Sequence, residues 1–144
     1  MSYFPLTHQR LCFCLGDWLK MTDKLHYLTH TGKIIPVSIA NTFGKRFRGL
    51  MCKKEGEYGL LLSPCNSIHT FFMRYELDAV FLDKKNRIIS IKRHIKPFSV
   101  VPPVPRASKV LEFPSSLHAS ESLKAGDKIL LYSYPEYNKC VSGI

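Results

Sequence analysis

The sequence predicts a mostly-β fold: a small single-domain β-sandwich or partly closed barrel with one short α-helix. Its length of 144 residues suits one domain. Its composition, 45% hydrophobic and 12% aromatic, is sufficient for a packed core. From Gly59 onward, short apolar and β-branched segments alternate with closely spaced turn signals, a pattern typical of small β-sandwiches and barrels.

The patterning also predicts the domain boundaries. Residues 1–20 show neither helical nor strand periodicity, so we expect them to form a poorly ordered N-terminal extension. Clean patterning begins at Met21, which leaves both Met1 and Met21 open as the translational start. We expect residues 21–134 to form a single β-rich domain and the polar residues 135–144 to form a tail.

The first expected element is a β-hairpin over residues 25–40. Thr31-Gly32 provides its turn signal, and the following residues alternate between apolar and other side chains, as in a half-buried strand. Pro36 lies within this second strand and has no N–H group, so the strand should be at an edge or bulged there.

A short helix is expected next. Thr42 can cap its first turn through the hydroxyl group. Phe43, Phe47, Leu50 and Met51 follow at the helical spacing i, i+4, i+7 and i+8, which predicts one apolar helix face.

The rest of the domain reads as strands. They are expected at residues 60–62, 69–73, 77–82, 88–91, 110–113 and 128–134. Turn residues 83–86 separate two of them, and four prolines within 97–105 predict an extended loop. Residues 120–123 are expected to make one helical turn, followed by a turn at Gly126-Asp127.

The net charge of +10 favours binding to polyanions such as nucleic acid, anionic lipid or cell-wall polymer. The charges are spread along the chain rather than collected in a basic tail. A solvated basic surface is therefore the simpler reading, and a polyanion stays a possible partner through net charge alone.

The five cysteines are odd in number and include no C-x-x-C pair. They are expected to be reduced thiols in a cytoplasmic protein. No run of apolar residues approaches the length of a transmembrane helix, about 18 residues.

Several motifs together resemble one known family. They are Ala40-Asn41-Thr42 with Arg46 and Gly49-Leu50-Met51; Gly59-Leu60-Leu61-Leu62; Phe72-Met73-Arg74 with Leu77-Asp78 and Phe81-Leu82-Asp83; and Val110-Leu111-Glu112 with Gly126-Asp127. In this order they are similar to the domain of unknown function 192 family, also called uncharacterised protein family 0127. The resemblance covers about residues 25–131 and implies a mostly-β fold with one short helix, but no activity. We expect its landmarks Gly49, Met51, Met73 and Asp78 to lie together at one end of the β structure.

Cys65 and His69 form the sharpest local pair. A thiolate and an imidazole could bind Zn²⁺, or could act as a nucleophile and its base with Asp78 orienting the histidine. Residues i and i+4 of a strand lie about 13 Å apart, so the pair can meet only if Asn66-Ser67 makes a turn. Otherwise Cys65 is a small buried hydrophobe and His69 a hydrogen-bonded residue at a strand start, and we favour this structural reading.

The expected ligand-binding residues are His69, Arg74, Asp78, Arg48 and Asp127. Asp78 lies in an apolar strand, so its carboxylate needs partners such as Arg48, Arg74 or backbone N–H groups, and a structural role is its simplest reading. Asp127 follows Gly126 and is most simply a turn residue.

The functional prediction is a non-enzymatic small-ligand-binding or accessory domain with a cleft near His69, Arg74 and Asp78. Its partner would be an unidentified small molecule or protein. The alternatives are a thiol-dependent hydrolase or transferase using Cys65 and His69, or a basic polyanion-binding protein. No cofactor is expected, because the sequence contains no phosphate-binding, dinucleotide-binding, HExxH or GxSxG motif.

Overall fold

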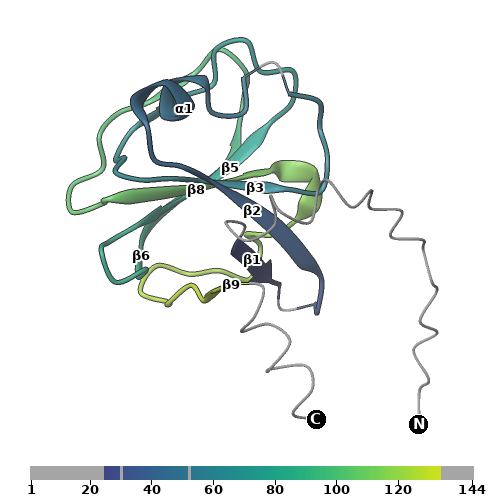
Figure 1. Cartoon of the computed structure of the whole chain (residues 1–144), viewed down its shortest axis with the longest axis vertical. Helices are drawn as coiled ribbons and strands as arrows, with labels where there is room; N and C mark the ends of the chain where they lie inside the picture. The colour runs from purple at the N-terminus through teal and green to yellow at the C-terminus, as the bar shows by residue number, and fades with distance from the viewer. Residues whose placement is uncertain (1–24, 30, 52, 134–144) are drawn as a thin grey trace, which may run out of the picture.

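The computed structural model describes residues 25–29, 31–51 and 53–133 (Figure 1). The expected N-terminal extension (1–20) and polar tail (135–144) lie outside the described residues, as does Met21.

A seven-stranded sheet dominates the fold, and a two-stranded sheet lies beside it. The large sheet comprises β1 (Leu25–Leu28), β2 (Ile34–Ala40), β3 (Gly59–Leu62), β5 (Leu77–Leu82), β6 (Ile88–Ile95), β8 (Lys109–Pro114) and β9 (Leu131–Ser133), in the order β6-β5-β8-β3-β2-β1-β9. The small sheet pairs β4 (Ile68–His69) with β7 (Val100–Val101). The mostly-β class is therefore confirmed, and the large sheet does not close into a barrel.

Both faces of the central strands are buried, which explains their nearly continuous apolar sequences. Along β5, Leu77, Ala79 and Phe81 pack into one core cluster, whereas Val80 and Leu82 pack into the other. β3 and β8 alternate in the same way. A polar side chain on one of these strands therefore lies inside the molecule whichever face it takes.

The predicted hairpin at residues 25–40 is confirmed, because β1 and β2 pair antiparallel. The expectation that Pro36 places this strand at an edge or in a bulge is wrong, because β2 is an internal strand with β3 parallel to it on its other side, and its register with β1 is unbroken at Pro36. The pairing with β3 begins at Val37, one residue after Pro36. Pro36 therefore lies where β2 still has a free edge on that side, and its missing N–H costs no bond to β3.

The predicted helix exists as α1 (Phe43–Arg48), and the hydroxyl of Thr42 accepts a hydrogen bond from the N–H of Lys45 at 3.3 Å. None of its residues is buried. The helix ends at Gly49, whose φ of 48° breaks the helical path before Leu50 and Met51. The apolar spacing found the helix, but it did not identify a buried face.

Two predicted elements are corrected. The strand expected at 69–73 is limited to β4, because the chain turns at Phe71-Phe72 and Phe72 takes a positive φ of 58°. The helical turn expected at 120–123 is a hydrogen-bonded turn from the N–H of Leu123 to the carbonyl of Ser120. A 3₁₀ helix, η2, instead covers Ser115–Leu117. Within the described residues, no helix is long and apolar enough to cross a membrane.

Candidate functional site

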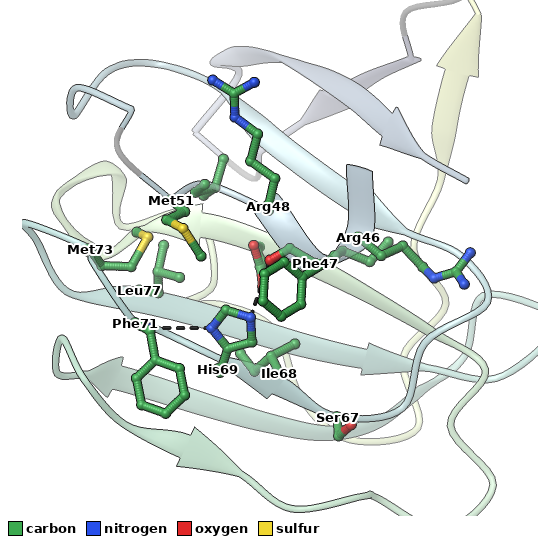
Figure 2. A pocket seen from close by; sticks show the side chains of 14 residues that line it. Arg46, Phe47, Arg48, Met51, Ser67, Ile68, His69, Phe71, Met73 and Leu77 are labelled. Atoms are coloured by element: carbon green, nitrogen blue, oxygen red, sulfur yellow. Dashed lines mark hydrogen bonds between the residues drawn. The ribbon is translucent and has the colours of Figure 1, made fainter. Parts of the chain in front are cut away.

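A small cavity lies where the segment after β2 crosses the face of the sheet (Figure 2). Its walls are residues 46–51 from α1 and its end, residues 67–69 with Phe71 and Met73, and Leu62, Leu77 and Glu112 from the large sheet. Its volume of about 40 Å³ has room for a few water molecules or one small polar group. Gly49, Met51 and Met73, three of the four expected landmarks, line this cavity.

Glu112 is the unusual residue of the cavity wall. It lies in β8 between Leu111 and Phe113, and only 3% of its surface is exposed. Its carboxyl group makes no hydrogen bond or ion pair with any residue that the structure describes. Burial raises its pKa to about 8, although the positive charge of Lys53 acts in the opposite direction. Glu112 therefore holds a proton at neutral pH and can donate a hydrogen bond into the cavity.

The backbone at Gly49 brings the cavity wall close to this carboxyl group. A side-chain carbon at Gly49 would lie 3.8 Å from Oε2 of Glu112, and the positive φ of 48° disfavours any larger residue there. Glycine therefore leaves the space in front of the acid open and turns the chain directly after α1.

A wider groove adjoins the cavity. It lies between β2, α1 and β3, encloses about 410 Å³, and shares Arg48 and Gly49 with the cavity. Lys45 and Lys53 also line it, together with Ser38, Ile39, Ala40 and Leu60. The groove therefore presents three positive charges next to a neutral buried acid, an arrangement that attracts anions.

His69 forms part of the cavity wall from β4. Its Nε2 donates a hydrogen bond to the carbonyl oxygen of Phe47 at 3.1 Å, and its Nδ1 accepts one from the N–H of Phe71 at 3.3 Å. This pattern requires a neutral ring with its proton on Nε2. Both ring nitrogens are engaged by backbone, so His69 joins α1 to the small sheet.

The thiol of Cys65 does not meet His69. Its Sγ donates a hydrogen bond to the carbonyl of Ser67 at 2.9 Å, and burial raises its pKa above the ordinary range for cysteine. A catalytic cysteine needs the opposite shift, because the thiolate is the nucleophile. Cys65 is half-buried and bonded to Ser67, and His69 is bonded to Phe47 and Phe71.

We expect Cys65 to be alkylated slowly by iodoacetamide at neutral pH, with a rate that rises only at alkaline pH. The reason is that its protonated thiol is half-buried and hydrogen-bonded to Ser67. Mass spectrometry of the Cys65 peptide over a pH series measures the rate, with the urea-unfolded chain as the accessible-thiol control. A rate that saturates near neutral pH and is lost in His69→Ala would restore the thiol-enzyme hypothesis.

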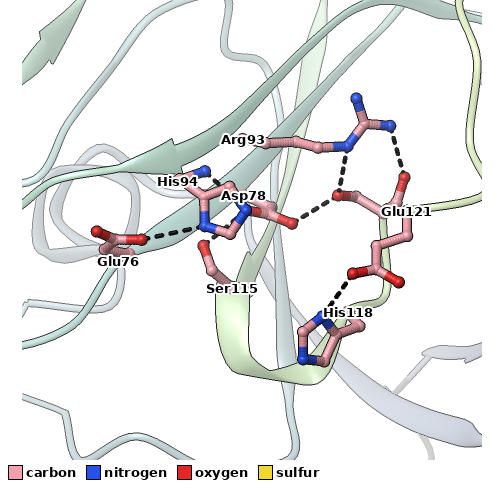
Figure 3. Close-up of polar contacts among 8 residues, drawn as sticks. Glu76, Asp78, Arg93, His94, Ser115, His118 and Glu121 are labelled. Carbon is pink, nitrogen blue, oxygen red and sulfur yellow. Dashed lines mark hydrogen bonds and ion pairs between the residues drawn. The ribbon is translucent and has the colours of Figure 1, made fainter.

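Asp78 lies on the other face of the sheet and does not line the cavity, so the expectation that all four landmarks lie together is wrong for Asp78. Its Oδ1 accepts hydrogen bonds from the hydroxyl of Ser115 at 2.6 Å and the N–H of His94 at 3.0 Å, and its Oδ2 accepts one from the hydroxyl of Ser120 at 2.6 Å (Figure 3). Arg93 donates to the hydroxyl and carbonyl oxygens of Ser120 from outside. Of the partners expected for Asp78, a backbone N–H is present, that of His94, together with two serine hydroxyls, whereas no hydrogen bond or ion pair joins Asp78 to Arg48 or Arg74.

The structure thus separates the five expected ligand-binding residues. His69 and Arg48 line the cavity, whereas Arg74, Asp78 and Asp127 do not. Asp127 is exposed, and its Oδ2 accepts a hydrogen bond from the N–H of Lys124 in the turn at Gly126. Asp78 and Asp127 both bond within the fold, so their carboxylates stabilise local structure.

Sequence reasoning missed Glu112 as a site residue. The signal was present, since an acid stands inside the apolar strand Val110-Leu111-Glu112-Phe113, as Asp78 does in β5. The pattern alone could not separate the two, because it does not show which acid finds hydrogen-bond donors. Among the residues that the structure describes, no three His, Cys, Asp or Glu side chains are grouped closely enough to hold a metal ion.

Comparison with known proteins identifies relatives of this chain. The model of DUF192, described as "Uncharacterized ACR", matches residues 26–131. The UPF0127 protein PH1112 of Pyrococcus horikoshii is 37% identical over 98 residues, which cover 65% of this chain and 84% of that protein. The UPF0127 protein TK1120 of Thermococcus kodakarensis is 33% identical over 111 residues, covering 73% of this chain and 70% of that one.

A solved structure shares the fold. It is the crystal structure of a protein of unknown function from Novosphingobium aromaticivorans, with a TM-score of 0.63 and 22% sequence identity. The match covers 74% of this chain and 83% of that one. At this level of identity the likeness concerns the arrangement of the strands.

Proposed function

The chain belongs to the DUF192 family of uncharacterised proteins, and from that premise we propose that it is a non-enzymatic binding module for a small organic anion. The observation that carries the proposal is the buried carboxyl group of Glu112, which has no hydrogen-bond partner in the described residues yet lines an open cavity. Buried polar groups in folded proteins are almost always paired, so one that faces a cavity is a candidate ligand contact.

The charges around the cavity select the ligand class. Arg46 and Arg48 form part of its wall with their guanidinium groups extending outward around its mouth (Figure 2), and Lys45 and Lys53 extend the positive surface into the adjoining groove. An anionic group is attracted there, while the protonated acid can donate a hydrogen bond to one of its oxygens. The sulfur-bearing side chains of Met51 and Met73 give the cavity an adaptable apolar wall for the carbon skeleton. A carboxylate with a short apolar chain combines these features.

The proposal retains His69 and Arg48 from the sequence-based set and replaces Arg74, Asp78 and Asp127 by Glu112. His69 holds the wall of the cavity through its bonds to Phe47 and Phe71. A cytoplasmic location, expected from the cysteine content, stays part of the proposal.

We expect small carboxylates, tested from formate to succinate, to bind most tightly between about pH 5 and pH 8. In this window the probes are ionised while Glu112, with a pKa of about 8, keeps its proton. Above that pKa, Glu112 becomes a second carboxylate and repels the ligand. Isothermal titration calorimetry over a pH series measures the effect directly.

Two substitutions at one position sharpen this test. Glu112→Gln keeps a hydrogen-bond donor but does not titrate. Carboxylates should therefore still bind, and their affinity should no longer fall above pH 8. Glu112→Leu removes the donor and should weaken binding at least ten-fold. Glu57→Gln is the matched control, because Glu57 is exposed and paired with Lys33 outside the cavity. Absence of binding to every probe near neutral pH, or affinity that increases above pH 8, contradicts the proposal.

A further inference from the structure

Large aromatic side chains are exposed beside the cavity. Phe43, Phe47 and Phe72 are exposed by 76%, 59% and 59%, although such rings usually lie inside a domain. The ring of Phe47 lies 5.3 Å from that of His69, and His69 lies 5.1 Å from Phe71. Phe43 stacks on Phe47 at 6.3 Å, with 18° between the ring planes. These rings, with Phe72, which follows Phe71 in the chain, and Phe98, which contacts Phe72, are called the aromatic surface below.

The second part of the aromatic surface is held in a costly backbone conformation. Phe72 and Phe98 contact one another edge to face at 5.7 Å, and both have positive φ values, of 58° and 57°. Bulky residues rarely adopt this region, and such strain is concentrated at functional positions. Their rings remain 59% and 64% exposed, so this conformation holds them out toward solvent instead of filling a core.

Positive charge is interleaved with these rings. The three segments that carry the aromatic surface, residues 42–51, 67–75 and 96–101, contain five Phe and five Lys or Arg, and no Asp or Glu. Arg46 and Arg48 extend in different directions on either side of Phe47 (Figure 2). The neighbouring acid, Glu112, is buried beneath them and protonated at neutral pH. The surface therefore combines stacking rings with cations that form no ion pair among the described residues, and the acid that follows these segments, Glu76, pairs with His94.

We propose that the aromatic surface binds single-stranded nucleic acid, with bases stacking on the exposed phenylalanines and phosphates pairing with the flanking arginines. Single strands are favoured because only unpaired bases can present their faces to the rings. The arginines on both sides of Phe47 suit phosphates that flank a stacked base. A membrane-binding surface would bury these rings in the apolar layer of the bilayer. Arg46 and Arg48, which flank Phe47, would then enter that layer as well, which disfavours a membrane as the partner. This surface extends beyond the small-anion cavity, because Phe43, Phe72 and Phe98 do not line it, whereas Arg46, Phe47 and Arg48 belong to both.

Fluorescence anisotropy with labelled oligo-dT, oligo-rU and a duplex of equal length tests this proposal. We expect both single strands to bind at least ten-fold more tightly than the duplex, with affinity that falls as salt rises. A difference between oligo-dT and oligo-rU distinguishes DNA from RNA as the preferred strand. Phe43→Ala and Phe72→Ala should each weaken binding about five-fold or more, because each removes one stacking ring. Leu130→Ala is the matched control, since Leu130 is also exposed, by 56%, but lies outside the aromatic surface.

Charge and cavity variants complete the design. Arg48→Gln should reduce the salt dependence of oligonucleotide binding by about one released counterion. Lys85→Gln is the control, because it removes one positive charge from the turn between β5 and β6 and should leave that salt dependence unchanged. Glu112→Leu should leave oligonucleotide affinity unchanged, so failure of small-anion binding and failure of this proposal are separate results. Equal affinity for single strands and duplex, unaffected by Phe43→Ala and Phe72→Ala, overturns it. So does phenylalanine-dependent binding to phosphatidylserine vesicles without oligonucleotide binding, which would assign the surface to a membrane.

Discussion

Glu112→Gln should make the protein more stable at alkaline pH while changing its stability much less at acidic pH. The folded-state pKa of Glu112 is about 8, against 4.5 for an ordinary glutamate. Below pH 4.5 both the folded and the unfolded chain hold the proton, and Glu112 causes no pH dependence. As pH rises from 4.5 to 8, the unfolded chain releases the proton first, so the free energy of unfolding decreases. Above pH 8 the loss is complete, and it amounts to about 3–5 kcal/mol.

Urea unfolding of the wild type and Glu112→Gln at a series of pH values checks this expectation. The difference between the two unfolding free energies cancels the titration of all other groups, so its slope reports Glu112 alone. Glu57→Gln serves as control, because an exposed ion pair such as Lys33–Glu57 contributes little, about 0–1 kcal/mol. Parallel curves for the wild type and Glu112→Gln would show that Glu112 ionises normally, and the small-anion site would lose its main support.

The second large effect is expected at Asp78. Asp78→Ala removes the acceptor for the hydroxyls of Ser115 and Ser120 and for the N–H of His94. Three donors would then lack their partner in the interior, and we expect a loss of about 3–5 kcal/mol in the free energy of unfolding. Asp78→Asn keeps the shape and part of the bonding, so its cost should be smaller, about 1–3 kcal/mol.

Asp83→Asn is the matched control for these variants. Oδ1 of Asp83 also accepts two backbone hydrogen bonds, from Lys85 at 2.7 Å and Arg87 at 2.9 Å, but in an exposed turn. The free energy of unfolding of the Asp83→Asn variant should stay close to that of the wild type. Carboxylate binding should also be unchanged in Asp78→Asn, because Asp78 lies on the face of the sheet away from the cavity. A stable Asp78→Ala variant with altered ligand affinity would instead make Asp78 a functional residue.

Much of the fold was predictable because local chemistry determines it. Thr42 and Gly49 delimit α1, and Thr31-Gly32 joins β1 to β2, by short-range rules that tertiary contacts did not override. The segment at 69–73 failed because its apolar composition does not reveal the turn at Phe71-Phe72. The N–H of Met73 donates to the carbonyl of Thr70 and closes this turn, and Thr70 also bonds to Lys96 and Ser99 beside β7. No periodicity within the segment indicates the positive φ of Phe72.

The candidate site was less predictable, because its character depends on which partners each buried group meets. Asp78 and Glu112 are both acids within apolar strands, and their sequences predict the same environment. Only the fold places two serine hydroxyls beside Asp78 and an open cavity beside Glu112. The exposed phenylalanines of α1 likewise follow a spacing typical of a buried face, and only tertiary structure shows that nothing among the described residues covers them.

The position of β8 between β3 and β5 has a consequence for synthesis. β3 and β5 are synthesised well before β8, which lies between them in the sheet. Until β8 is made, one edge of each strand therefore has no partner. Apolar strands with open edges are vulnerable to pairing with other chains during that interval. The three hydrogen-bond donors to Asp78 also lie later in the chain than Asp78 itself. Until these residues are synthesised, the Asp78 carboxylate has none of these partners, and burying an unpaired charge is costly.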